Sequence, residues 1–156
     1  MKHLLASLFL ITVFAACGKI NLAEKNVAVP DHAWASNFQP KIQFDIKDDT
    51  ATLYNIYVVL RHNDAYRYKN IWMDISVQPP GDSTFTNRRE LILANDAKGW
   101  LGTGMDDLFE HRILLTDKPT LFSKKGTYTF TLKQIMREDP LENILNVGIR
   151  IEKAKE

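Results

Sequence analysis

Alternation of apolar and polar residues with a period of two is the feature that most constrains the fold of this chain. In residues 41–47, KIQFDIK, the apolar Ile42, Phe44 and Ile46 alternate with charged and amide side chains. Successive side chains of a strand point to opposite faces, so this pattern is typical of a strand with one buried face. No segment longer than a turn or two has a helical period. The pattern therefore predicts β structure.

Seven runs of this kind follow one another, and turn-forming residues such as Pro79-Pro80-Gly81-Asp82 separate them. A further strand could lie near residues 27–29. Short strands without intervening helices predict an all-β fold, an antiparallel β-sandwich of seven to eight strands that is jelly-roll-like or immunoglobulin-like. The seven runs are residues 41–47, 52–63, 70–78, 89–94, 111–115, 126–134 and 146–153.

The start of the chain has the layout of a secretory signal. Lys2 gives a basic start, residues 4–14 are an apolar run, and two alanines precede Cys17. The run is shorter than the roughly 20 apolar residues that span a bilayer. Cys17 is the only cysteine, so it cannot form an internal disulfide. The sequence Phe-Ala-Ala-Cys is similar to the lipobox of bacterial lipoprotein precursors, which implies that Cys17 is acylated. The alternative is an ordinary signal peptide with a cysteine there by chance.

These features divide the chain into three parts. Residues 1–16 are expected to be a cleaved signal peptide, residues 17–30 a lipidated cysteine and tether, and residues 31–156 one β-sandwich domain. Removal of the signal takes away Lys2 and leaves 19 of the 20 basic residues against 19 acidic ones. This balance argues against a nucleic-acid partner, which would require a basic excess.

Residues with catalytic chemistry are few. The chain has none of the nucleophile-elbow, zinc-protease or phosphate-loop motifs. His32, His62 and His111 lack the spacing of metal ligands. Acidic clusters at residues 48–49 and 106–110 could bind calcium or act in a glycosidase, but carboxylates in turns are usually solvated. We therefore expect no enzymatic activity, no metal and no cofactor, with a hydrolase as a weak alternative.

Aromatic residues offer a second alternative. Tyr66 and Tyr68 flank Arg67, and Trp72 faces away from the apolar side of its strand. A sandwich that presents these three rings on one flat face could stack on sugars as a lipid-tethered glycan-binding module. The rings could equally cover the second face of a sheet, because sandwich cores need large residues from both sheets.

Three segments carry a specific resemblance. KGWLGTGMDDLFEHRILL (98–115), GTYTFTLKQIMREDPLENILNVGIRIEK (126–153) and the earlier LYNIYVVLRHNDAYRYKNIWMDI (53–75) are similar to the gliding-motility lipoprotein GldH family of Bacteroidetes. The resemblance implies a membrane-anchored lipoprotein that supports gliding motility and the associated type IX secretion machinery, with no enzymatic activity attributed to the family. It also implies other envelope or motility lipoproteins as partners. Many members occur in bacteria that do not glide, so the broader expectation is assembly or stabilisation of a cell-envelope complex.

The location follows from the same resemblance. In lipoproteins of this phylum, acidic residues directly after the lipidated cysteine are associated with surface display, and residues 18–22 contain none. We therefore expect a lipid anchor in the outer membrane, with the domain on the periplasmic side.

A partner site, if there is one, is expected among polar residues of these segments that a sandwich core does not require. An exposed apolar or mixed patch near residues 102–112 would support it. The alternative is structural, in which Arg61, Arg112, Arg137 and Arg150 pair with acids at 106–107 and 138–139 and fix long loops onto the sandwich. The candidate residues for partner binding or loop clamping are Asp106, Asp107, Glu110, His111, Arg112, Arg137, Glu138 and Asp139.

Overall fold

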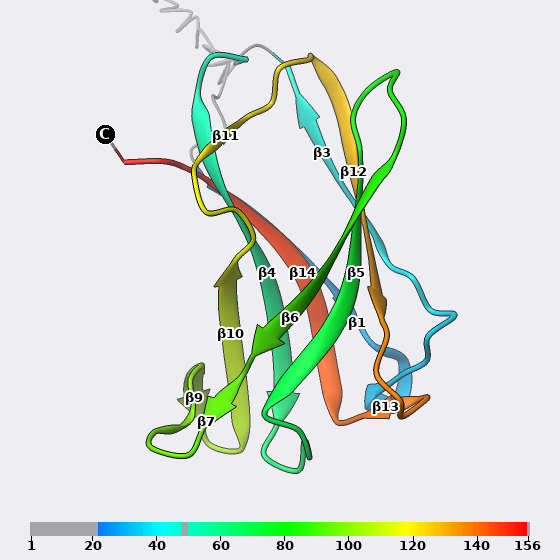
Figure 1. Cartoon of the computed structure of the whole chain (residues 1–156), viewed down its shortest axis with the longest axis vertical. Coiled ribbons are helices and arrows are strands. Elements are labelled where there is room, and N and C mark those ends of the chain that lie inside the picture. Colours follow the sequence, from blue (N-terminus) through cyan, green and yellow to red (C-terminus); the bar gives the residue numbers. More distant parts are fainter. Residues whose placement is uncertain (1–21, 48–49, 156) are drawn as a thin grey trace, which may run out of the picture.

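Two antiparallel sheets packed face to face make up the domain in a computed structural model that describes residues 22–47 and 50–155 (Figure 1). Sheet A contains, in spatial order, β1 (Leu22–Ala28), β14 (Ile144–Lys153), β4 (Leu53–Asn63), β10 (Leu108–Leu114) and β9 (Thr103–Met105), and β11 (Thr120–Leu121) pairs with the start of β4. Sheet B contains β3 (Lys41–Ile46), β12 (Gly126–Gln134), β5 (Asn70–Gln78) and β6 (Phe85–Ile92).

The predicted antiparallel sandwich is confirmed, with more strands than expected. All seven predicted runs form strands, and the described residues contain 14 strands against the seven to eight predicted. Most of the additional strands are two or three residues long, too short to show an alternating pattern in the sequence. Two small pairs and one helical turn complete the fold: β2 (Ala33–Trp34) with β13 (Leu141–Glu142), β7 (Ala94–Asn95) with β8 (Gly99–Trp100), and the 3₁₀ turn η1 (Pro30–His32).

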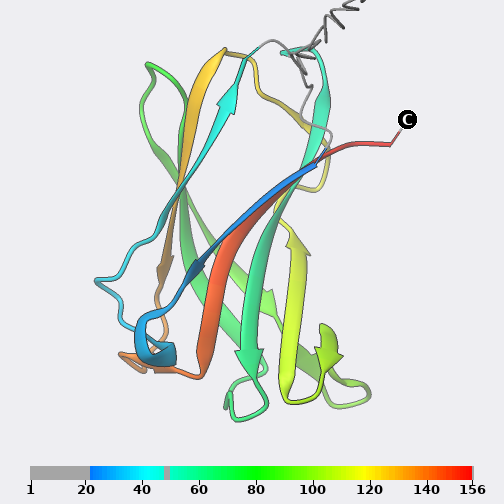
Figure 2. The ribbon, with the colours of Figure 1, turned by 180° about the vertical axis from the view of Figure 1, so that it is seen from behind.

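β1 occupies a segment that the sequence predicted to be tether. It pairs with β14 over its whole length, from Leu22 opposite Glu152 to Ala28 opposite Asn146, and forms an edge of sheet A (Figure 2). The predicted tether therefore does not extend through residues 22–28. As an edge strand β1 buries little, so its sequence shows no clear alternation. Cys17 and the predicted signal peptide lie outside the described residues.

The core lies between the inner faces of the two sheets. Tyr54, Ile56, Val58 and Leu60 of β4 point into it, as the alternation predicts, and β4 is central in sheet A. Trp34 is fully buried at one end of the core, where its Nε1 donates a hydrogen bond to the carbonyl of Phe38 at 2.8 Å. This bond satisfies the indole N–H that burial would otherwise leave unpaired.

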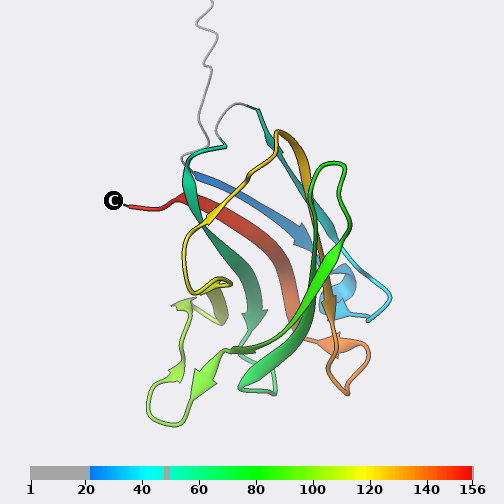
Figure 3. The same ribbon diagram turned by 45° about the horizontal axis from the view of Figure 1, so that its top comes forward.

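The two long sides of the sandwich differ. On one side β1 and β3 approach each other, and Lys25 Nζ donates to the carbonyl of Gln43 at 2.6 Å. On the other side the sheets diverge between β6 and the link from β10 to β12 (Figure 3). The side chains of Phe85 and Arg89 lie on the inner face of β6 but are exposed, whereas Leu91 on the same face is buried. The sandwich is therefore closed on one side and open on the other.

Candidate functional site

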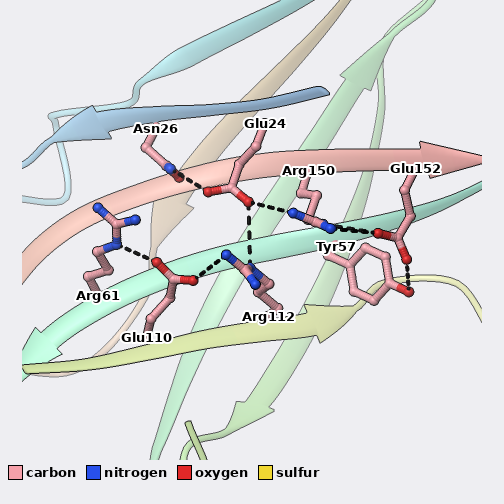
Figure 4. Close-up of polar contacts among 8 residues, drawn as sticks. All are labelled: Glu24, Asn26, Tyr57, Arg61, Glu110, Arg112, Arg150 and Glu152. Carbon is pink, nitrogen blue, oxygen red and sulfur yellow. Dashed lines mark hydrogen bonds and ion pairs between the residues drawn. The ribbon is translucent and has the colours of Figure 1, made fainter. Parts of the chain in front are cut away.

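The outer face of sheet A carries a continuous set of polar contacts across four strands, which we call the charge network (Figure 4). Its members alternate along their strands with residues that face the core, so the pleat places them all on the outer face. The network consists of Glu24 and Asn26 on β1, Arg150 and Glu152 on β14, Tyr57 and Arg61 on β4, and Glu110 and Arg112 on β10.

Glu110 connects two arginines at one end of the charge network. Its carboxylate accepts hydrogen bonds from Arg61 Nε at 2.6 Å and pairs with Arg112 Nη2 at 2.7 Å. Arg112 also reaches Glu24 of β1, with its Nε 3.5 Å from the carboxylate. This last contact spans β4 and β14, so it connects the two sides of sheet A.

Arg150 connects the rest of the charge network. Its Nη1 lies 3.2 Å from Glu24 and its Nη2 2.8 Å from Glu152, and Tyr57 donates its hydroxyl proton to Glu152 at 2.9 Å. The side chains of Glu24 and Arg150 are only 18% and 19% exposed. Ion pairs with this degree of burial are screened less by salt than fully exposed pairs.

Gly148 makes the crossing from Arg112 to Glu24 possible. It lies between Asn26 of β1 and Val59 of β4 on the outer face, directly in the gap that the two charged side chains bridge. A Cβ at this position would come within 1.9 Å of Asn26 Oδ1 and 2.4 Å of the carbonyl oxygen of Lys25. The missing side chain therefore allows β1 to pack closely here, a role typical of glycine in strands.

The carboxylates of Glu24 and Glu152 are held in their ionised form. Burial opposes ionisation of Glu24, but hydrogen bonds from Asn26 and Arg150 and the charges of Arg112 and Arg150 outweigh it, so its pKa is lowered. The hydrogen bond from Arg150 is the main cause of a lowered pKa at Glu152. Both groups stabilise the fold above the pKa of the unfolded chain and lose that contribution as the pH falls below it.

We expect Glu24→Gln to reduce the free energy of unfolding by about 1 kcal/mol, because it leaves the part-buried Arg150 with one carboxylate instead of two. Asp96→Asn is the matched control, since Asp96 is 90% exposed in its pair with Lys69. Exposed pairs contribute about 0–1 kcal/mol, so this variant should stay close to wild type. Urea unfolding of both variants measures the difference. Equal losses would contradict a special role for Glu24.

The arginines pair with different acids from those expected. Arg61, Arg112 and Arg150 contact glutamates on their own or other strands of sheet A, and none of them pairs with Asp106, Asp107, Glu138 or Asp139 among the contacts of the described residues. Strand register decides the pairs between strands, and a single sequence does not reveal which strands are neighbours. Glu24, Asn26, Tyr57 and Glu152 are the four residues of the charge network that the sequence analysis did not name as candidates.

The expected loop clamps exist with other partners. Glu138, in the loop after β12, accepts hydrogen bonds from Arg67 and from the hydroxyl of Tyr68, the latter at 2.8 Å. Asp139 accepts from the backbone N–H of Ser36 at 2.8 Å and from its hydroxyl. The exposed Arg137 in the same loop lines a shallow hollow with Tyr68 and Trp72. These acids therefore hold loops at one end of the sandwich.

Asp106 and Asp107 form the turn between β9 and β10. Asp106 has a positive φ of 53°, a conformation that Asp tolerates better than most residues. The carbonyl of Asp107 accepts a hydrogen bond from the backbone N–H of Asp64 at 2.9 Å. Both side chains are exposed, so they are available to a partner.

Exposed apolar side chains surround this turn and the charge network on β10. Leu108 and Leu114 lie at the two ends of the outer face of β10, with Glu110 and Arg112 between them. The patch predicted near residues 102–112 is therefore present as a mixture of apolar and charged groups. We call it the β10 patch; its apolar members are Ile92 (49% exposed), Leu101 (45%), Met105 (74%), Leu108 (42%) and Leu114 (45%).

His111 does not belong to this surface. It points from β10 into the core, where its Nε2 lies 2.9 Å from Nε2 of the fully buried His62. His62 Nδ1 contacts the carbonyl of Asn63 at 2.6 Å, so this nitrogen carries the proton and His111 donates to His62. Burial, and then the proximity of His62, lowers the pKa of His111 to about 4. The prediction of a surface role failed because the strand register turns His111 inward.

The proposed aromatic platform is not flat. Tyr66 is 3% exposed and donates its hydroxyl proton to the carbonyl of Asn70 at 2.9 Å. Tyr68 is half-buried against Glu138, and Trp72 is 39% exposed on the outer face of sheet B. Tyr66 therefore covers the core, which agrees with the structural alternative for these rings.

The described part of the chain contains no cluster of three or more His, Cys, Asp or Glu side chains arranged to hold a metal ion. No helix within residues 22–47 and 50–155 is long and apolar enough to cross a membrane.

Comparison with known proteins gives a consistent family match. The sequence model described as GldH lipoprotein matches residues 21–151. A gliding motility lipoprotein GldH homolog of Christiangramia forsetii is 26% identical over 154 residues, which cover 94% of this chain and 93% of that protein. Gliding motility lipoprotein GldH of Flavobacterium johnsoniae is 28% identical over 127 residues, 77% of each chain. Among solved structures, the mosquito-larvicidal Cry4Aa toxin of Bacillus thuringiensis matches 85% of this chain and 21% of its own, at 10% identity and a TM-score of 0.43, a likeness too low to indicate function.

Proposed function

This chain belongs to the GldH lipoprotein family, and from that membership we propose that it supports gliding motility by assembling or stabilising a cell-envelope complex associated with type IX secretion. In this proposal Cys17 carries the lipid, and the domain acts on the periplasmic side of the outer membrane. Each buried methylene contributes about 0.8 kcal/mol to membrane binding, so two or more acyl chains give a stable anchor. The domain binds other envelope proteins and catalyses no reaction.

The β10 patch is the observation that best supports a binding role. It combines exposed apolar side chains with the charged Glu110 and Arg112. Among the apolar side chains, Met105 and Leu108 lie opposite each other in the β9–β10 hairpin. Contiguous apolar patches rimmed by polar residues often mark protein–protein interaction sites, and a charged surround adds specificity to an apolar contact. The partner class that fits is another folded envelope protein.

We expect Leu108→Glu to weaken partner binding at least tenfold, because it places a charge in the apolar part of the interface. The measurement is crosslinking and affinity purification of the lipidated protein from its native envelope, followed by identification of the co-purifying proteins. An Asp106→Ala/Asp107→Ala variant tests the turn in the same way.

Leu53→Glu is the matched control. Leu53 is 47% exposed and lies at the opposite end of β4 from Asn63, the residue that pairs with Leu108. At about 3.3 Å per residue, the two ends of this strand are roughly 33 Å apart. Equal loss of partners in Leu53→Glu and Leu108→Glu, or no loss in either, would overturn the assignment of the interface to the β10 patch.

A further inference from the structure

We propose that the open side of the sandwich is a binding site for a single acyl chain that ends in a carboxylate, as in a fatty acid. A cavity of about 360 Å³ lies there between the two sheets. Its volume falls within the range of about 300–1,000 Å³ that is common for small-molecule sites. β6 forms one wall, and the link between β10 and β12 forms the opposite wall (Figure 3).

Two bridges frame the mouth of this cavity. Arg89 Nη2, on the inner face of β6, donates to the carbonyl of Leu115 at 3.3 Å. Lys124 Nζ, next to β12, pairs with Asp82 in the β5–β6 turn at 2.7 Å. Each bridge joins one wall to the other. An extended polypeptide added along β6 would have to displace both of them, whereas a slender ligand can enter between them.

The interior of the cavity is apolar. Phe85 on the inner face of β6 is 51% exposed, so its ring lines the cavity and is not fully packed against sheet A. Burial of hydrocarbon against such a surface is favourable in proportion to the area removed from water. A sugar would leave most of its hydroxyls unpaired there, so the lining fits an alkyl chain. The other apolar lining residues include Ile56, Ile75, Val77, Leu115, Phe122 and Phe130.

Hydrogen-bond donors gather at one end of the cavity. Arg89 has no carboxylate partner among the described residues, and its one hydrogen bond there goes to the carbonyl of Leu115. The next residue, Thr116, has its Oγ1 buried with no hydrogen-bond partner in the described part of the chain. A guanidinium has five N–H donors and a hydroxyl has one, so unused donors remain at this end. A carboxylate would accept from both groups and would form a charge-assisted hydrogen bond with Arg89.

The test is a calorimetric titration of the purified protein with decanoate and decanol. We expect decanoate to bind about tenfold more tightly than decanol, and octanoate to bind more weakly by about fourfold for each methylene removed. Methyl NMR should show shifts at Ile56, Ile75 and Val77. Arg89→Gln should weaken decanoate binding about tenfold and remove the preference over decanol, and Thr116→Val should reduce that preference.

Arg88→Gln is the matched control, because Arg88 is the neighbouring residue of β6 but faces outward and pairs with Asp74 at 2.9 Å. It removes the same charge and should leave decanoate binding unchanged. The proposal is overturned if decanoate does not bind, if the two arginine variants lose the same affinity, or if the shifted methyl groups lie outside the cavity. The proteins that co-purify with the Leu108→Glu variant report on the β10 patch alone. The outcome of the decanoate titration therefore does not decide the proposed function, and the reverse also holds.

Discussion

Replacing Gly148 with alanine should lower the free energy of unfolding by about 3 kcal/mol and release β1 from sheet A. The added Cβ would meet Asn26 Oδ1 at 1.9 Å and the carbonyl oxygen of Lys25 at 2.4 Å. The amide of Asn26 can rotate away, but the carbonyl belongs to the backbone of β1, so the strand itself must move. Guanidinium chloride unfolding measures the loss, and hydrogen exchange should be faster for the amides of residues 22–28 than for those of β4.

Two further variants make this prediction specific. Asn26→Ala combined with Gly148→Ala removes the nearer obstacle only, so it should recover part of the stability and not all of it. Gly104→Ala is the control, because the three nearest neighbours of its Cβ would be ring carbons of Phe109, the closest at 3.0 Å, and a ring edge can shift. An unfolding free energy of Gly148→Ala within about 0.5 kcal/mol of wild type would contradict the close packing of β1 on β14.

Lowering the pH from 7.5 to 5 should cost about 2 kcal/mol of stability through His111 alone. The folded chain holds the pKa of His111 at about 4, against 6.5 for an unperturbed histidine. The unfolded chain takes up a proton below pH 6.5 while the folded chain stays neutral, so stability is complete above that pH and falls toward pH 4. Burial also lowers the pKa of His62, which adds to the loss in the same direction. Denaturant unfolding at several pH values between 7.5 and 5 gives the slope.

The control for this prediction is His32→Asn. His32 is exposed and has a positive φ of 55°, a conformation that Asn also tolerates. This variant leaves His62 and His111 in place, so the slope that they cause should remain. The double variant His62→Phe/His111→Leu lacks both core histidines. It should flatten the dependence of the unfolding free energy on pH, even if its stability at pH 7.5 differs from that of wild type. The carboxylates with lowered pKa values, such as Glu24 and Asp74, titrate below this window. A slope that survives in the double variant would assign the acid sensitivity to other groups.

Period-two alternation was sufficient to predict the class of fold and most of the long strands. Residues 41–47 and 126–134 show it clearly, and both form strands of sheet B in antiparallel register. A strand was expected only near residues 27–29, and the rest of β1 was missed because an edge strand with one partner buries little and needs no apolar face. The two-residue strands were missed because their pairing depends on which loops the sandwich brings together, as with Trp34 opposite Leu141.

Four of the eight residues of the charge network were candidates from the sequence, but their contacts were not predictable: Arg61, Glu110, Arg112 and Arg150. Arg150 alternates in the sequence with the apolar Ile149 and Ile151, and it lies on the outer face of sheet A. Its pairing with Glu24 follows from the antiparallel register of β1 against β14, which brings together residues 126 positions apart, whereas Glu152 lies two residues along the same strand. The buried position of His111 could not be predicted either, because its place beside His62 depends on how β10 pairs with β4.

The position of β1 determines how the domain would respond to a force applied through the proposed lipid on Cys17. Only residues 18–21 separate Cys17 from β1, so with the proposed lipid on Cys17 any pull between membrane and domain enters the fold at Leu22. Tension along β1 loads its seven residue pairs with β14 together, whereas tension across it would open them one after another. The contacts of Glu24 with Arg150 and Arg112 lie two residues from the point of entry and resist that opening. Forced unfolding is governed by the unfolding rate, so with a lipid on Cys17 the charge network would slow the detachment of β1 under a pulling force.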